Sequence, residues 1–249
     1  MKSDKYKAIK QFFATRQVFT WRDFSCFLIS LGTTNEGTQK QILNNHLKAK
    51  RITRIRRELF LSVGDAFLPE NAPADPYLIS GKAADYAVVA YHSALELHGE
   101  AYSVFFQSTF LTGKNIMPFS YREHDYIPTR FPFSLVEKNK IFFECDTVNR
   151  GGVSFKVTSL ERTFVDVLDR PNISGGWEEV IRSLDSIQVL DIDKVIQYAV
   201  LLDNSLVIKR VGYLLEAKKE HLHMEERLIK KLEKHVASSQ QYFDRSLKD

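Results

Sequence analysis

The spacing of apolar residues near the start of the chain predicts three helices followed by a pair of strands. Apolar side chains recur at helical spacing from Asp4 to Thr15 and again from Trp21 to Leu31, the second segment following Thr20, a residue type that caps helices. Thr38 is expected to cap a third helix that runs to about Ala49. Arg51 to Val63 in part alternates between apolar and polar residues and in part runs apolar, which predicts two short strands.

This order of elements is typical of a winged helix-turn-helix. A β-prone segment, Val18 to Thr20, separates the first two helices, and a turn around Gly32 to Gly37 separates the second from the third. Helix, short strand, helix, turn, helix and two-stranded ribbon then follow one another. We therefore expect residues 1–68 to form a winged helix-turn-helix domain.

A proline-rich stretch divides the chain after this module. Pro69 to Pro76 holds three prolines, which disfavour helix, so we expect a linker at about residues 69–76. Residues 77–249 are expected to form a larger α+β domain with a small antiparallel sheet and a helical C-terminal end. Its expected strands are Ser103 to Leu111, Phe119 to Tyr126, Lys140 to Asp146 and Val153 to Val157, and its expected helices include Ala87 to His98, Trp177 to Ile187, Ile192 to Leu202, Leu206 to Lys219 and Met224 to His235.

Charge is distributed unevenly between the two parts. Residues 1–68 carry 13 Lys and Arg against 5 Asp and Glu, a net charge of +8, whereas the remainder carries 22 basic and 26 acidic residues, a net charge of −4, within a total of +4. A small basic module attached to a mildly acidic body indicates a polyanionic partner, most often nucleic acid. The 249 residues, 44% of them hydrophobic, suffice for two folded domains.

Several classes of protein are excluded by simple counts. The two cysteines, Cys26 and Cys145, are too few for a disulfide framework. No apolar run approaches the roughly 18 residues of a membrane span, and no secretory signal follows the charged first ten residues. We expect a cytoplasmic protein with no membrane partner.

The third helix presents one polar face. On a helical wheel, Ile42, Leu43 and Leu47 define the buried side, with Gln39 and His46 among them. Asn and Gln can bond adenine in the major groove, and Lys can reach guanine or phosphate. The candidate DNA-binding residues of this helix are Thr38, Lys40, Gln41, Asn44, Asn45 and Lys48.

Arginines gather on the ribbon that follows. Four of them stand within seven positions, where they can contact phosphates or enter a minor groove. The candidate DNA-binding residues here are Lys50, Arg51, Arg54, Arg56 and Arg57. The alternative is a solvated basic face that binds nothing.

The search for catalytic chemistry gives three weak candidates. His92 and Glu96 share a helix face, but with His98 they do not make a zinc-protease motif, and a structural pair is preferred. Cys145 with His124 would form a thiol nucleophile only if the fold joined them. We expect no catalytic residue, no metal and no cofactor.

A nuclease is the third candidate. Glu144 and Asp146 alternate on an expected strand, so their carboxylates share a face on which Mg²⁺ binds. The expected hairpin partner offers Lys156 but no acid-x-lysine motif, and the alternative is that Lys156 pairs with one of these acids across the strands.

The sequence resembles the AbiEi-type antitoxins of bacterial abortive-infection and toxin–antitoxin loci. The resemblance runs from about Phe19 to Glu216. It rests on patches in the same order: Phe19 to Phe24, His46 to Phe60, Tyr91 to Gly99, Val157 to Asp166 and Lys209 to Glu216.

The resemblance implies a winged helix that represses its own operon by binding inverted repeats of double-stranded DNA in the promoter. It also implies a C-terminal domain that counteracts a nucleotidyltransferase-like toxin without a stable complex, in the bacterial cytoplasm. A ligand- or partner-sensing transcription regulator is the alternative function, and a DNA-targeted nuclease is the third.

Two details qualify the resemblance. Glu58 stands where family members often carry Gly, so the wing is expected to turn differently and to repel phosphate. In the second part, Arg162 and Asp166 are four residues apart and are expected to form a weak pair on a helix surface.

Overall fold

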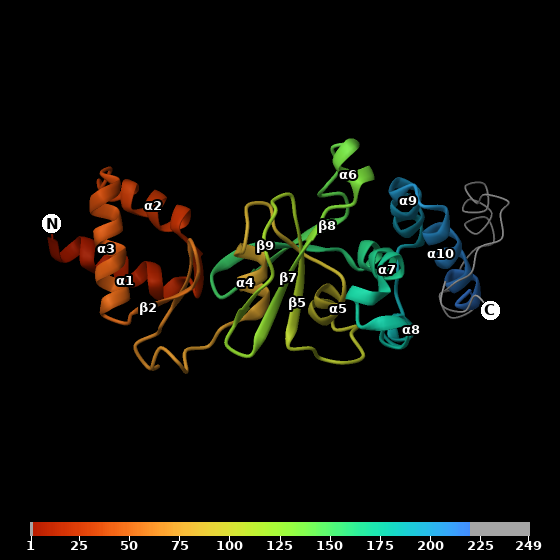
Figure 1. Ribbon diagram of the computed structural model, residues 1–249, viewed down its shortest axis with the longest axis horizontal. Helices are drawn as coiled ribbons and strands as arrows, with labels where there is room; N and C mark the ends of the chain where they lie inside the picture. Colours follow the sequence, from red (N-terminus) through yellow and green to blue (C-terminus); the bar gives the residue numbers. More distant parts are fainter. Residues whose placement is uncertain (1, 220–249) are drawn as a thin grey trace.

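The protein is elongated, with its helices and strands arranged in three successive groups. The structure is a computed structural model, and it describes residues 2–219. Figure 1 shows the first three helices at one end, a large sheet in the middle and the last helices at the other end. Within these residues the fold is mixed α+β, with ten α-helices and two sheets.

The N-terminal module contains three helices and one small sheet. Strand order in the antiparallel sheet is β1-β3-β2, so the last strand lies between the other two. The elements are α1 (Lys2–Thr15), β1 (Val18–Thr20), α2 (Trp21–Ser30), α3 (Glu36–Lys48), β2 (Ile52–Arg56) and β3 (Leu59–Ser62).

Side-chain caps set the starts of α2 and α3. Thr20 and Asp23 form a reciprocal capping box at the start of α2, as the sequence indicates. The expected cap of α3 was wrong: the helix begins after Asn35, whose side chain accepts from the Thr38 backbone, because Asn is as good a cap as Thr and stands one turn earlier.

Both faces of the middle strand of the small sheet, β3, are buried. On β3, Phe60 faces a cluster of phenylalanines inside the module, whereas Leu59 and Leu61 face the second part of the chain. Successive strand residues point to opposite faces, so β3 has no solvent-exposed side. The small sheet is therefore shared between the core of its own module and the contact with the rest of the protein.

The second part is built on a six-stranded sheet of order β6-β7-β5-β4-β9-β8. Helix α4 packs on this sheet and also contacts β1. The elements are α4 (Pro76–Lys82), β4 (Val88–Val89), α5 (His92–His98), β5 (Gln107–Thr112), β6 (Phe119–Tyr121), β7 (His124–Arg130), α6 (Phe133–Glu137), β8 (Cys145–Arg150) and β9 (Val153–Thr158).

The expectation of a small antiparallel sheet was wrong. The sheet is mixed, because β4 pairs in parallel with β9, and β5 pairs in parallel with β7. Ala87 to His98 is likewise not one helix: β4 occupies its start, and Tyr91 has a φ of 58°, which ends the strand before α5 begins. Val88 and Val89 are buried on both faces, so this central strand lacks the alternation by which strands are recognised.

Two other expected strands differ in extent. Phe119 to Tyr126 is split into β6 and β7 by a turn at Arg122, whose φ is 55°. Lys140 to Asp146 is mostly non-strand, because β8 begins only at Cys145 after Glu144 with a φ of 45°.

Helices complete the described chain. They are α7 (Leu160–Asp169), a 3-10 turn η1 (Pro171–Ile173), α8 (Gly176–Ser186), α9 (Ile192–Leu202) and α10 (Ser205–Ala217). They enclose a separate apolar core that includes Phe164, Leu184 and Val211. The expected helix Met224 to His235 lies outside the described residues.

Arg162 and Asp166 do not form the expected surface pair. Both side chains are buried, at 0% and 1% exposed. Asp166 accepts hydrogen bonds from Arg162 Nε at 3.3 Å and from the Tyr198 hydroxyl at 2.5 Å. Arg162 Nη1 also donates to the carbonyl oxygens of Ile141 and Phe143. The helix spacing was read correctly, but α9 and the 141–143 loop cover the pair.

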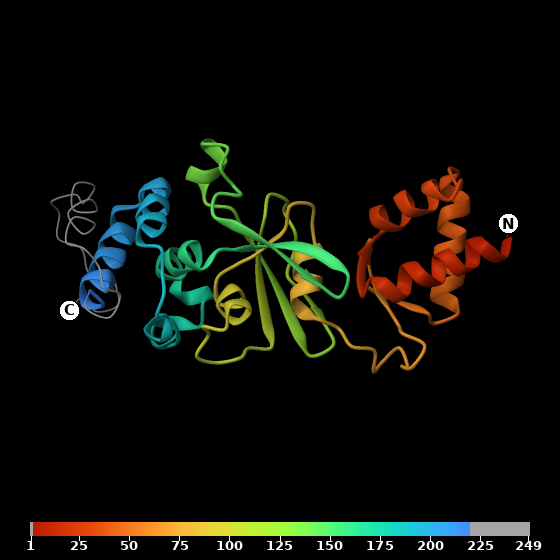
Figure 2. The same cartoon turned by 180° about the vertical axis from the view of Figure 1, so that it is seen from behind.

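The two parts of the chain meet in close contact. Figure 2 shows the β8–β9 hairpin reaching towards the N-terminal module, and the Gln17 amide donates to the Gly151 carbonyl there. A Cβ on Gly152, whose φ is 71°, would lie 1.7 Å from the Thr15 carbonyl oxygen. This position therefore needs glycine.

The proline-rich segment also packs against its surroundings. Arg122 donates to the carbonyl oxygens of Ala72 and Pro69, and Gln17 donates to the Pro73 carbonyl. Ala72 is fully buried.

Among the helices of residues 2–219, none has the length and apolar composition that a membrane span requires.

Candidate nucleic-acid interface

Helix α3 is held against α2 by a buried glutamine. Gln39 is 1% exposed, accepts from the Ser25 hydroxyl at 2.7 Å and donates to the Thr33 carbonyl at 2.7 Å. These bonds satisfy the amide inside an apolar core and connect α2, the turn and α3. Leu43 and His46 are the other buried residues of the helix.

The opposite face of α3 is open to solvent. All six polar residues that the wheel places there are exposed: Thr38, Lys40, Gln41, Asn44, Asn45 and Lys48. The stripe is therefore available to a partner, as its use in DNA binding requires. That use itself stays a prediction.

Neighbouring side chains on the stripe interact with one another. Gln41 Nε2 donates to Asn45 Oδ1 at 3.1 Å, one helical turn away. Lys40 forms an exposed ion pair with Glu36 at 2.6 Å. Surface pairs of this kind contribute little, so Lys40 can exchange Glu36 for a phosphate at low cost.

Three of the four arginines in and beside the β2–β3 hairpin are exposed. Arg54 and Arg57 lie on the β2–β3 hairpin, and Arg51 precedes it, beside exposed Lys50. The Arg51 guanidinium lies 5.3 Å from the centre of the Tyr6 ring, and that of Arg54 lies 5.7 Å from the Phe60 ring. Stacking on aromatic rings orients a guanidinium and leaves its N–H groups available.

Arg56 lies towards the second part of the chain and is only partly exposed. Its guanidinium lies 4.6 Å from the centre of the Phe119 ring of β6, and its Nη1 is buried without a hydrogen-bond partner among the described residues. Burial lowers the pKa of this guanidinium below its usual value. A bulge in β2 between Arg54 and Arg56 accompanies this change of direction.

The β2–β3 hairpin turns at Glu58 in the conformation that favours glycine. Glu58 has a φ of 63°, a left-handed conformation that costs a non-glycine residue strain. Its carbonyl accepts from the Trp21 amide, which ties the wing to the start of α2.

The expected pair of His92 and Glu96 is structural. Both side chains are buried, and His92 Nε2 lies 3.1 Å from Glu179, which also accepts from the Ser103 amide. Burial alone would raise the pKa of the Glu179 carboxyl, but the hydrogen bonds from Ser103 and His92 outweigh that effect, so the pKa is lowered. His98 bonds the Thr158 carbonyl instead. Within residues 2–219, no group of three or more His, Cys, Asp or Glu side chains is arranged to hold a metal.

The other catalytic candidates are not assembled. Cys145 is on β8 and His124 on β7, with three strands between them, and burial raises the pKa of the Cys145 thiol to about 11. Glu144 precedes β8 and pairs with Lys194 at 3.2 Å, so it does not share a strand face with Asp146. Lys156 Nζ lies over the Phe142 ring.

Sequence reasoning missed two groups of residues around the wing. Phe119 and Tyr121 of β6 contact it, the latter through a 3.1 Å hydrogen bond between its hydroxyl and that of Thr53. Tyr6 and Lys10 of α1 lie beside Arg51. No local pattern marks such contacts between distant segments, although the placement of His46 on an apolar helix face is a signal for the second group.

The comparisons with known proteins give information on the fold but not on the function. No protein-family model and no curated protein matches the chain. The crystal structure of the RV2827C protein from Mycobacterium tuberculosis is similar over 94% of this chain and 82% of its own, with a TM-score of 0.54 and 12% sequence identity. At that identity the similarity concerns the fold alone.

Proposed function

We propose that residues 1–68 form a winged helix-turn-helix domain that binds double-stranded DNA, with α3 as the recognition helix. The element order and the strand order β1-β3-β2 support this assignment. The observation that carries the proposal is the exposed polar stripe of α3, because amides and lysines on one open helix face are the groups that read a major groove.

Affinity and sequence choice come from different residues. Arg51, Arg54 and Arg57 supply phosphate contacts, which position the protein without reading sequence. The side-chain amides of Gln41, Asn44 and Asn45 supply contacts to base edges. The hydrogen bond between Gln41 and Asn45 orients these two amides relative to each other. Arg56 is left out of the proposed DNA contacts because of its position over Phe119.

We further propose that the protein is a non-enzymatic antitoxin and autorepressor in the bacterial cytoplasm, acting on inverted repeats in its own promoter and counteracting a nucleotidyltransferase-like toxin. This part rests on the resemblance of the quoted patches to AbiEi-type antitoxins. A gene for a nucleotidyltransferase-like protein next to this one supports the proposal, and its absence favours a ligand- or partner-sensing regulator.

Replacement of Asn44 tests direct readout. Asn44→Ala is expected to weaken binding to a duplex of the native promoter by about 1–3 kcal/mol while binding to random DNA stays unchanged. Fluorescence anisotropy on both duplexes measures the difference, and Gln11→Ala, which removes an exposed amide from α1, is the matched control. An equal loss on both duplexes contradicts the role of Asn44.

The arginines are separated by the salt dependence of binding. Arg54→Gln and Arg57→Gln are each expected to reduce the slope of log K against log[salt] by about 0.9, the value for one phosphate contact. Arg56→Gln leaves the slope unchanged, because the Arg56 guanidinium is directed towards Phe119. A reduced slope for Arg56→Gln alone contradicts this division.

Co-expression separates repression from neutralisation. The full chain carrying Asn44→Ala and Asn45→Ala is expressed from an inducible promoter together with the neighbouring gene. We expect growth to be rescued as with the unaltered chain, although repression of the native promoter is lost. If the product of the neighbouring gene is toxic and neither the unaltered chain nor the double variant restores growth, the antitoxin function is contradicted.

A further inference from the structure

A cavity of about 260 Å³ lies in the N-terminal module, beside the proposed DNA contacts. It is bordered by α1, the end of α3 and the segments on either side of the β2–β3 hairpin, and it is partly open to solvent. Its walls include Tyr6, Lys10, Phe13, His46, Arg51 and Val63.

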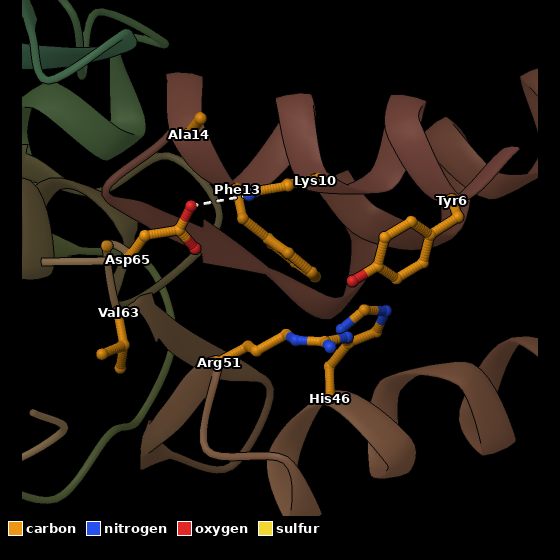
Figure 3. Close-up of a pocket in the computed structure, with 9 residues that line it drawn as sticks. Tyr6, Lys10, Phe13, Ala14, His46, Arg51, Val63 and Asp65 are labelled. Carbon is orange, nitrogen blue, oxygen red and sulfur yellow. Dashed lines mark ion pairs between the residues drawn. The ribbon is translucent and has the colours of Figure 1, made fainter. Parts of the chain in front are cut away.

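The cavity combines an apolar wall with a cationic end. Figure 3 shows the Tyr6 ring, the Arg51 guanidinium and the His46 ring gathered at one end, and the Lys10–Asp65 ion pair at the other. Lys10 and Asp65 neutralise each other across 2.7 Å. Within residues 2–219 Arg51 forms no ion pair with a carboxylate, so the lining keeps one positive charge that suits a monoanion.

His46 supplies a second, independent signal. It is 7% exposed, and its Nδ1 is buried with no hydrogen-bond partner among the described residues. Burial, together with the nearby Arg51, lowers the pKa of this imidazole, which favours its neutral form. A buried polar atom without a partner at the wall of a cavity is a position for a ligand group, because leaving it unpaired is costly.

The size and shape of the wall favour a flat ring. A cavity of roughly 150 Å³ with apolar walls accepts benzene, so this cavity has room for a ring that bears a carboxylate. Phe13 lines the wall and makes a T-shaped contact with His46, with ring centres 4.9 Å apart. Tyr6 adds a second ring, stacked with Arg51.

We propose that this cavity binds a small aromatic carboxylate, whose anionic group pairs with Arg51 beside the unpartnered His46 Nδ1 and whose ring packs between Tyr6 and Phe13. Since Arg51 is also a proposed phosphate contact, the bound carboxylate withdraws it from DNA. The ligand therefore weakens operator binding. This last step rests on the proposed function, whereas the binding site does not.

Calorimetric titration of the full chain with benzoate tests the site directly. We expect saturable one-to-one binding with a Kd at or below about 10 mM. Arg51→Gln is expected to weaken it at least about tenfold, because a charged hydrogen-bonding group is lost. Arg54→Gln is the matched control, since it removes a wing arginine that does not line the cavity, and its Kd stays within about twofold.

A second variant protects the test against misfolding. Ala14 lines the cavity and is exposed, so Ala14→Phe blocks the space without disturbing the core, and it is expected to abolish benzoate binding. Neutral benzamide and inorganic phosphate are each expected to bind more weakly than benzoate. Equal binding of benzamide overturns the anionic part, and equal binding of phosphate overturns the aromatic part. Unchanged benzoate binding in both variants overturns the site.

DNA binding is measured separately. Benzoate at saturation is expected to lower the affinity for the promoter duplex several-fold in the unaltered chain and in Arg54→Gln, but not in Arg51→Gln. Benzoate binding with unchanged DNA affinity overturns the coupling. If the chain binds benzoate but no duplex, the proposed function fails and the site stands; if it binds duplex but no benzoate, the site fails and the proposed function stands.

Discussion

Removal of the Arg162 guanidinium is expected to destabilise the protein far more than loss of a surface ion pair. The guanidinium and the Asp166 carboxylate are buried, with Nε and Oδ2 3.3 Å apart. At that distance and an effective dielectric constant of about 20, their attraction is about 5 kcal/mol. Arg162→Met removes this attraction while the carboxylate stays in the core, so we expect the free energy of unfolding to fall by about 3–5 kcal/mol.

A double-mutant cycle isolates the interaction between the two residues. Asp166→Leu in the Arg162→Met background removes the unpaired carboxylate, and we expect the double variant to recover about 2–3 kcal/mol relative to the sum of the single changes. Recovery is incomplete because the carbonyl oxygens of Ile141 and Phe143 and the Tyr198 hydroxyl lose partners. Urea unfolding followed by circular dichroism measures all four proteins.

The pH dependence supplies a further check. Burial raises the pKa of the Asp166 carboxyl, and Arg162 opposes that rise. In Arg162→Met the opposition is gone, so the pKa in the folded state rises further above the unfolded value. A group with a raised folded pKa stabilises below the unfolded pKa and loses that contribution as pH rises. The deficit of Arg162→Met is therefore expected to be larger at pH 8 than at pH 5.

A surface pair with the same spacing is the control. Glu36 and Lys40 are also four residues apart, at 2.6 Å, but both are exposed. Lys40→Met is expected to change the free energy of unfolding by less than about 1 kcal/mol. The reasoning is refuted if Arg162→Met lowers the free energy of unfolding by no more than the control variant does. It is also refuted if the effects of Arg162→Met and Asp166→Leu add to within about 0.5 kcal/mol in the double variant.

Three smaller predictions use the same unfolding assay. Glu58→Gly is expected to stabilise by about 0.5–1 kcal/mol by relieving the positive φ, and a lower midpoint contradicts this. Gly152→Ala is expected to cost more than about 2 kcal/mol, since its Cβ meets the Thr15 carbonyl; an unchanged midpoint counts against that contact. Burial lowers the pKa of His46 in the folded state, so the free energy of unfolding is expected to fall as the pH drops below about 6.5. The fall is expected to be smaller in His46→Gln, and an equal fall in that variant would exclude His46 as its source.

The N-terminal module was predictable because its signals are local. The Thr20 cap of α2, the apolar spacing of α1 and α2 and the apolar run of β3 are all signals that act within a few residues. The start of α3 was misplaced because Asn35 and Thr38 are both cap residues, and only backbone geometry distinguishes them.

The mixed sheet was not predictable from the same signals. Its central strand β4 has two residues, and its parallel partner β9 follows more than sixty residues later. Pairing between distant segments leaves no periodic trace in either one. For the same reason the wheel placed the exposed stripe of α3 correctly, whereas the contact of Arg56 with Phe119 depends on tertiary packing.

The burial of β3 on both faces has a consequence for the geometry of an assembly on DNA. Because Leu59 and Leu61 pack against the second part, swinging the N-terminal module away would expose both side chains to solvent. In the proposed complex the direction of each body relative to the duplex axis is then set once α3 enters a groove. On an inverted repeat, two copies of the protein bind, and the number of base pairs between the half-sites decides whether their second parts collide, touch or remain apart. Changing that spacing by half a helical turn, about 5 base pairs, places the two copies on opposite sides of the duplex.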